Sequence, residues 1–123
     1  MLLLHYFLIG LGAALGATLR VAIGELIALS TNGFATPILF VNVLGCFIMG
    51  IATALLTTLP ENIRFFLIPG FLGGFTTFSS FALEFGLLYE KNLYITAILY
   101  AGLSIFLSLI CFFAGLKIMR LFL

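Results

Sequence analysis

Four long apolar stretches, divided by very few charged residues, limit what this chain can fold into. They cover approximately residues 3–24, 37–58, 62–89 and 93–116 of the 123-residue sequence. A helix needs about 20 mostly apolar residues to cross the hydrocarbon core of a bilayer. The sequence therefore predicts an all-α membrane protein, with residues 1–123 forming a single four-helix transmembrane domain.

The composition supports a lipid environment for the outer surface. Hydrophobic residues make up 64% of the chain and charged residues 7%, whereas a soluble domain carries about 25% charged residues. The net charge of +1 leaves no basic surface for nucleic acid. We therefore expect a lipid bilayer around the protein and no nucleic-acid partner.

The loop charges barely favour one orientation in the membrane. With four spans both termini lie on one side, together with Arg64, Lys117 and Arg120, while Arg20 and Lys91 lie on the other. Orientation follows the Lys and Arg bias of the loops, and this bias is weak. The sequence thus permits insertion either way up, and two copies in opposite orientations could then pair, although one residue or a partner could also decide the orientation.

The third span contains residues that disfavour an unbroken helix. Pro69 removes a helical hydrogen bond, and Gly73-Gly74 allows the backbone to leave helical geometry. We expect a break at about residues 73–77. It could be a simple kink, or it could expose carbonyl groups that hold a cation such as Na⁺ between two opposed copies.

Phenylalanines recur every third residue around this predicted break. The spacing of Phe75, Phe78 and Phe81 predicts one shared helical face, with Ser79 and Ser80 between the last two. The rings could simply pack against lipid or other helices. Because an aromatic ring has a positive edge, they could also contact an anion without binding it too tightly for conduction.

Polar residues on the second and fourth spans allow two interpretations each. Asn42 could form an interhelical hydrogen bond or line a pore. One face of the fourth span carries a hydroxyl stripe that could be a helix–helix seam, a hydroxyl-lined track, or both. Its members are spaced by four: Thr96, Tyr100, Ser104 and Ser108.

The remaining features are less specific. Gly12-x-x-x-Gly16 and Gly70-x-x-x-Gly74 predict close helix packing. Arg20 and Glu84 lie near span ends, where a surface charge is the simplest interpretation. His5 is typical of a membrane interface, and the two cysteines are too sparse for a disulfide or metal site.

Three motifs together resemble those of a known family. The stretches over residues 12–20, 41–50 and 73–81 resemble first-, second- and third-helix motifs of the Fluc (CrcB) fluoride channels. Gly73-Gly74-Phe75-Thr76-Thr77-Phe78-Ser79-Ser80-Phe81 is the most specific. The family often has Gly-Thr where this chain has Pro37 and Ile38, so one pore hydroxyl is missing.

The resemblance implies a dual-topology homodimer with two antiparallel fluoride pores and a structural Na⁺ at its centre. The carbonyls of Gly73 and Thr76 would hold the Na⁺, and Arg20 and Glu84 would lie in the vestibules. The implied fluoride-pore residues are Asn42, Phe78, Phe81, Ser79, Ser80, Tyr100, Ser104 and Ser108.

Three functions fit these observations to different degrees. The first is passive export of F⁻ across the plasma (inner) membrane of a bacterium or archaeon. The second is a dual-topology multidrug-type exporter, but such a pump needs a membrane-embedded carboxylate, and Glu25, Glu61, Glu84 and Glu90 all lie near span ends. The third is a membrane assembly subunit. An enzyme is not expected, because no nucleophile–base pair or phosphate loop is evident.

Overall fold

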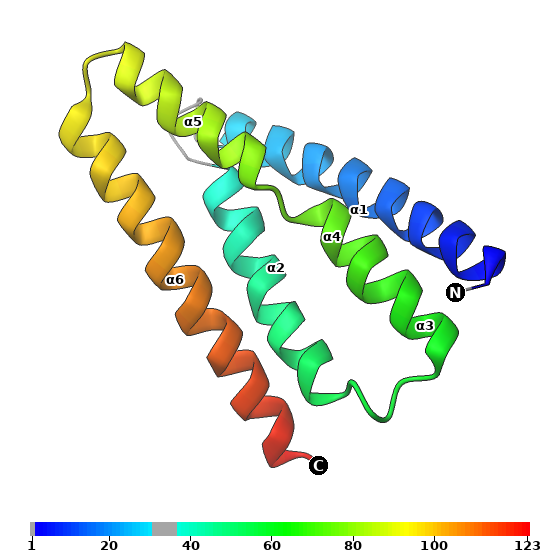
Figure 1. Cartoon of the computed structure of the whole chain (residues 1–123). Coiled ribbons are helices and arrows are strands. Elements are labelled where there is room, and N and C mark those ends of the chain that lie inside the picture. The colour runs from blue at the N-terminus through cyan, green and yellow to red at the C-terminus, as the bar shows by residue number, and fades with distance from the viewer. Residues whose placement is uncertain (1, 31–36) are drawn as a thin grey trace.

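Four membrane-length helical spans make up the chain (Figure 1). The computed structural model describes residues 2–30 and 37–123, and every regular element in that part is a helix. Three spans are single helices: α1 (Leu3–Ser30), α2 (Pro37–Ala54) and α6 (Tyr94–Leu121). The third extends over Glu61–Glu90. The prediction of four membrane-length helices is thus confirmed, and the chain is a multi-pass membrane protein.

The third span is divided into four helical pieces with a break between the last two. It consists of α3 (Glu61–Phe65), the π-helix η1 (Phe66–Leu72), α4 (Gly73–Phe75) and α5 (Phe78–Glu90). Thr76 and Thr77 are extended, with φ/ψ of −86°/150° and −153°/125°. Figure 1 shows this non-helical segment between α4 and α5. The predicted break is confirmed, but it is confined to the two threonines, and the two glycines stay helical.

Pro69 lies inside the π-helix rather than at the break. Proline has no N–H to donate and its ring crowds the preceding turn of an α-helix. The wider turn of η1 accommodates this local disruption without ending the helix. The sequence signal at Pro69 therefore marks a π-helical stretch that ends about one turn before the chain becomes extended.

The first half of the third span packs closely on α1. A Cβ atom at Gly12 would collide with the Phe66 carbonyl oxygen, and one at Gly16 with the Phe71 carbonyl oxygen. Glycine at both positions therefore lets the two backbones come into direct contact. The predicted close packing of this glycine face is confirmed.

A second glycine contact joins α2 to α6. A Cβ atom at Gly50 would meet the Phe112 carbonyl, and one at Gly115 would meet the Phe47 carbonyl. These two helices share the most extensive interface in the described chain, which places α2 centrally between α6 and the α1–third-span pair (Figure 1).

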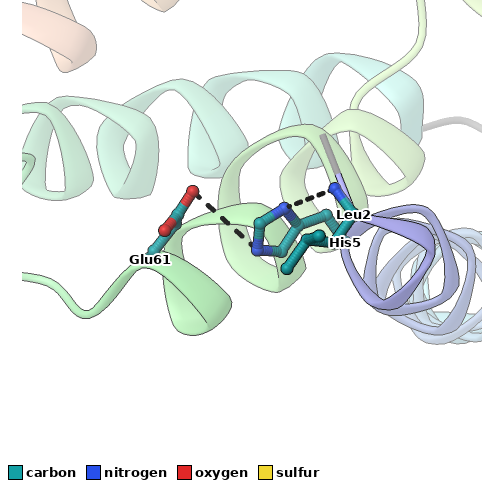
Figure 2. A network of polar contacts seen from close by, with 3 residues as sticks. All are labelled: Leu2, His5 and Glu61. Carbon is teal, nitrogen blue, oxygen red and sulfur yellow. Dashed lines mark hydrogen bonds and ion pairs between the residues drawn. The ribbon is translucent and has the colours of Figure 1, made fainter.

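His5 joins the start of α1 to the start of the third span (Figure 2). Its ring stacks on Phe65 with 4.4 Å between centroids, and its Nε2 atom lies 3.8 Å from Glu61 Oε1. The Leu2 backbone N–H donates to His5 Nδ1 at 3.4 Å. Because His5 is only 5% exposed, it acts as a packed contact between the two helices.

Candidate functional site

A cavity of about 390 Å³ lies beside the break in the third span. Its walls come from α2, the break, α5 and α6, and none of its lining residues is charged. These residues are Asn42, Cys46, Thr76, Thr77, Phe78, Phe81, Ser104, Ile105, Ser108 and Leu109. The cavity therefore offers amide, hydroxyl and aromatic groups in an otherwise apolar wall.

The Asn42 side chain holds the extended segment in place. Its Nδ2 donates to the Thr77 carbonyl at 2.9 Å, and its Oδ1 accepts from the Thr77 backbone N–H at 2.8 Å. Both backbone groups that the break frees at this residue are thereby satisfied, as a low-dielectric surrounding requires. Asn42 forms an interhelical hydrogen bond and also lines the cavity, so both sequence interpretations apply.

Thr77 also begins the second half of the span. Its Oγ1 accepts a hydrogen bond from the Ser80 backbone N–H at 3.2 Å, which caps the N-terminus of α5. The Ser79 hydroxyl lies 3.2 Å from the same oxygen. The N-terminus of a helix carries a partial positive charge. The start of α5, at Phe78 beside the cavity, is therefore electrostatically favourable for an anion.

The carbonyl groups that end α4 are satisfied unequally. Leu72 O accepts from both the backbone N–H and the hydroxyl of Thr76, at 3.0 and 2.9 Å. Gly74 O accepts from Arg20 Nε at 3.2 Å. Within residues 2–30 and 37–123, the carbonyls of Gly73, Phe75 and Thr76 receive no hydrogen bond. Gly73 and Thr76 are the two carbonyls that the family resemblance singles out for Na⁺.

The break separates the three phenylalanines that the sequence spacing placed on one face. Phe75 is 1% exposed and stacks with Phe71, whereas Phe78 is 79% exposed. The prediction of one shared face is wrong for Phe75, because two extended residues turn α5 relative to α4. Phe78 and Phe81 remain neighbours, with ring centroids 5.3 Å apart.

The hydroxyl stripe of α6 changes its surroundings along the helix. Tyr100 stacks on Phe81 at 5.3 Å and donates from its hydroxyl to Glu84 Oε1 at 2.6 Å. Ser104 and Ser108 face the cavity. The Ser104 hydroxyl is buried and has no hydrogen-bond partner in the part of the chain that the structure describes. The stripe is thus a seam near the N-terminal end of α6, at Tyr100, and a polar wall further along, at Ser104 and Ser108.

The cavity brings together half of the predicted site residues: Asn42, Thr76, Phe78, Phe81, Ser104 and Ser108. The others lie close to the break or to cavity-lining neighbours without lining the cavity themselves, namely Arg20, Gly73, Ser79, Ser80, Glu84 and Tyr100. Sequence reasoning missed four lining residues, namely Cys46, Thr77, Ile105 and Leu109. Only two of them had a usable signal: Cys46 follows Asn42 by one helical turn, and a threonine directly before a helix is a favoured N-cap.

Comparison with known proteins identifies the family of this chain. Residues 7–116 match the family model described as "CrcB-like protein, Camphor Resistance (CrcB)". This chain belongs to the CrcB-like family. The CrcB-like resemblance drawn from the three motifs is therefore confirmed, and it covers all four spans.

Curated CrcB-like relatives carry a functional name. A protein of Rhizobium etli named "Fluoride-specific ion channel FluC" is 41% identical over 96% of this chain and 98% of its own length. Proteins with the same name from Paracoccus denitrificans and Bordetella pertussis are 42% and 40% identical. They are aligned over 94% and 98% of this chain and 95% and 94% of their own lengths.

Proposed function

We propose that this CrcB-like chain is a fluoride-selective channel that lets F⁻ leave the cytoplasm passively across a bacterial or archaeal inner membrane. The observation that carries the proposal is the uncharged cavity at the break, where hydroxyl and amide groups face the phenylalanine rings. The choice of fluoride as the ion is based on the names of the relatives in Rhizobium, Paracoccus and Bordetella.

The cavity residues suit a small, strongly hydrated anion that must pass without being trapped. Ser104 and Ser108 can donate hydroxyl hydrogens, and the Asn42 amide has a second N–H beyond the one bound to Thr77. The edges of Phe78 and Phe81 add weak positive potential. Neutral donors replace water around the ion, while a Lys or Arg would hold it too tightly for conduction.

A pore of this kind needs more wall than one chain provides. Phe78 is 79% exposed, so one side of the cavity remains uncovered in the single chain. We assign the missing wall to a second, inverted copy, which the weak loop-charge bias permits. Two copies related by an axis in the membrane plane would form two antiparallel pores.

The same pairing suits a structural Na⁺ at the dimer centre. Carbonyl oxygens are suitable ligands for a hard cation, and broken spans in transporters present them in this way. The unpartnered carbonyls of Gly73 and Thr76 fit that role, and Gly73 is exposed on the surface of the chain. Two copies would contribute four carbonyls.

The remaining predicted residues take supporting places in this proposal. Tyr100 continues the polar track toward the end of the pore, where its hydroxyl contacts Glu84. Ser79 and Ser80 supply hydroxyl groups at the start of α5. Glu84, which accepts from Tyr100, and Arg20, which donates to Gly74 O, belong to the vestibule region.

Ion efflux from liposomes that contain the purified protein tests the proposed function. We expect fluoride to leave the vesicles and chloride to be retained, each followed with an ion-selective electrode. Protein-free vesicles give the background leak. Absence of fluoride efflux, or chloride efflux at the same rate, contradicts the proposal.

Substitution of the rings tests the proposed path itself. Phe78→Ile and Phe81→Ile should slow fluoride efflux about threefold to tenfold, the change expected from losing roughly 1 kcal/mol of ring-edge contact. Phe106→Ile is the matched control, because Phe106 is 68% exposed and lies outside the cavity lining. Equal rates in all three variants would reduce the rings to a packing role.

A further inference from the structure

Arg20 reaches a part of the molecule that its position near a span end did not suggest. Its Nε donates to the Gly74 carbonyl at 3.2 Å, across 54 positions of sequence. Gly74 belongs to α4, the short helical piece that ends at the break. The side chain is therefore directed at the carbonyl end of the first half of the third span.

The end of α4 carries several carbonyls without helical partners. The last four carbonyls of a helix have no N–H ahead of them, and here they belong to Gly73, Gly74, Phe75 and the C-cap residue Thr76. Thr76 satisfies Leu72, and Arg20 satisfies Gly74. A guanidinium group also complements the partial negative charge of such an end.

We propose that Arg20 is a positioning residue that caps α4 at Gly74 and so determines which carbonyls of the break remain free to face a cation. The part concerning the cation rests on the proposed function. By occupying Gly74 O, Arg20 removes it as a competing ligand and leaves the carbonyls of Gly73, Phe75 and Thr76. By anchoring the end of α4 to α1, it fixes where the chain turns toward Thr77.

Close packing next to Arg20 limits how the hydrogen bond can be replaced. Gly74 approaches Ala13 so closely that a Cβ atom there would lie 2.9 Å from Ala13 Cα, and Ala13 precedes Arg20 by two turns of α1. The two backbones are thus in contact along this edge, and the Arg20 side chain extends that contact to the last turn of α4.

Hydrogen exchange at the break tests the capping role without depending on transport. In Arg20→Met, we expect the amides of Thr76 and Thr77 to exchange about tenfold faster than in the unaltered protein, as for the loss of a charge-assisted hydrogen bond. Arg20→Lys, which keeps a charged donor, should recover most of the protection. Thr18→Val is the matched control, because the Thr18 hydroxyl bonds only to Ala14 O within α1.

Sodium titration of thermal unfolding tests the ligand-selecting role. The unaltered protein and Thr18→Val should melt at higher temperature as Na⁺ replaces N-methylglucamine, and Arg20→Met should need about tenfold more Na⁺ for the same shift. Unchanged exchange and an unchanged sodium response in Arg20→Met would overturn the proposal. So would the lack of any sodium response in the unaltered protein.

If Arg20→Met does not fold, a second pair of variants tests the capping role of Arg20. Arg20→Lys should then retain more protection at Thr76 and Thr77 than Arg20→Gln, whose shorter side chain is neutral. The reverse order, or no difference, would overturn the proposal. Failure of the unaltered protein to pass fluoride would contradict the channel function alone, because the exchange comparison still measures the cap.

Discussion

The two halves of the third span differ in how much of their surface the chain itself covers. The half before the break includes the buried residues Gly70, Leu72 and Phe75 and packs along α1. The half after the break, α5, has no buried residue. One half is thus held by intrachain contacts, whereas the other presents its surface outward.

Glycines show the same contrast at the level of single atoms. Gly16 faces the backbone of the first half with no space for a Cβ atom, while Gly86 in α5 has nothing within 4 Å. The first half is therefore fixed by backbone contact, and the second half is free to meet lipid or the inverted copy that we propose. A break placed between the two halves can be rigid on one side and exposed on the other.

The largest effect should come from filling the backbone contact of the first half. Gly16→Ala should destabilise the protein by about 1–3 kcal/mol, because the added methyl group overpacks a tight interface. Gly86→Ala and Gly10→Ala should leave the melting temperature unchanged or slightly raised, since alanine favours helix at open positions. Circular dichroism melts in detergent provide the measurement, and equal melting of Gly16→Ala and Gly86→Ala would remove the contrast between the halves.

An effect of similar size should follow from releasing the break from α2. Asn42→Ala leaves the Thr77 N–H and carbonyl unpaired, which should cost about 1–3 kcal/mol and also slow fluoride efflux. Thr53→Val is the control, because it removes a side-chain hydrogen bond to Met49 O within the same helix. If Asn42→Ala melted and conducted like Thr53→Val, Asn42 would have no special role in joining the halves.

Much of this arrangement could be predicted because its causes are local. Hydropathy fixes the spans, since an exposed polar backbone is excluded from the hydrocarbon core. Gly73-Gly74 located the break to within a few residues. The spacing of Ser104 and Ser108 put them on one face because a single regular helix carries both.

Other features depended on contacts between distant segments. The sequence gives no register across the break, so Phe75 and Phe78 were placed on one face although the first is buried and the second exposed. The partner of Asn42 and the reach of Arg20 to Gly74 arise only when the spans pack. The π-helical turns around Pro69 likewise required the structure, because proline alone predicts only a kink or an end.

The smallest effect on stability, and the sharpest test of the cavity wall, concerns Ser104. Its hydroxyl is buried without a hydrogen-bond partner in the described chain, so removing it costs no internal hydrogen bond. Ser104→Ala should therefore melt at the same temperature or slightly higher, by at most about 1 kcal/mol of stability. If the hydroxyl instead donates to a passing anion, efflux of fluoride should fall about threefold or more.

Thr96→Val is the control for this last comparison, because Thr96 lies on α6 at an exposed position outside the cavity lining. Stability and flux should both stay unchanged in it. Opposite movements of stability and flux in Ser104→Ala would identify a hydroxyl kept for transport at some cost to packing. A fall in both stability and fluoride flux would instead make Ser104 part of the packing interface between α2 and α6. Ser104 would then not belong to the polar wall of the cavity.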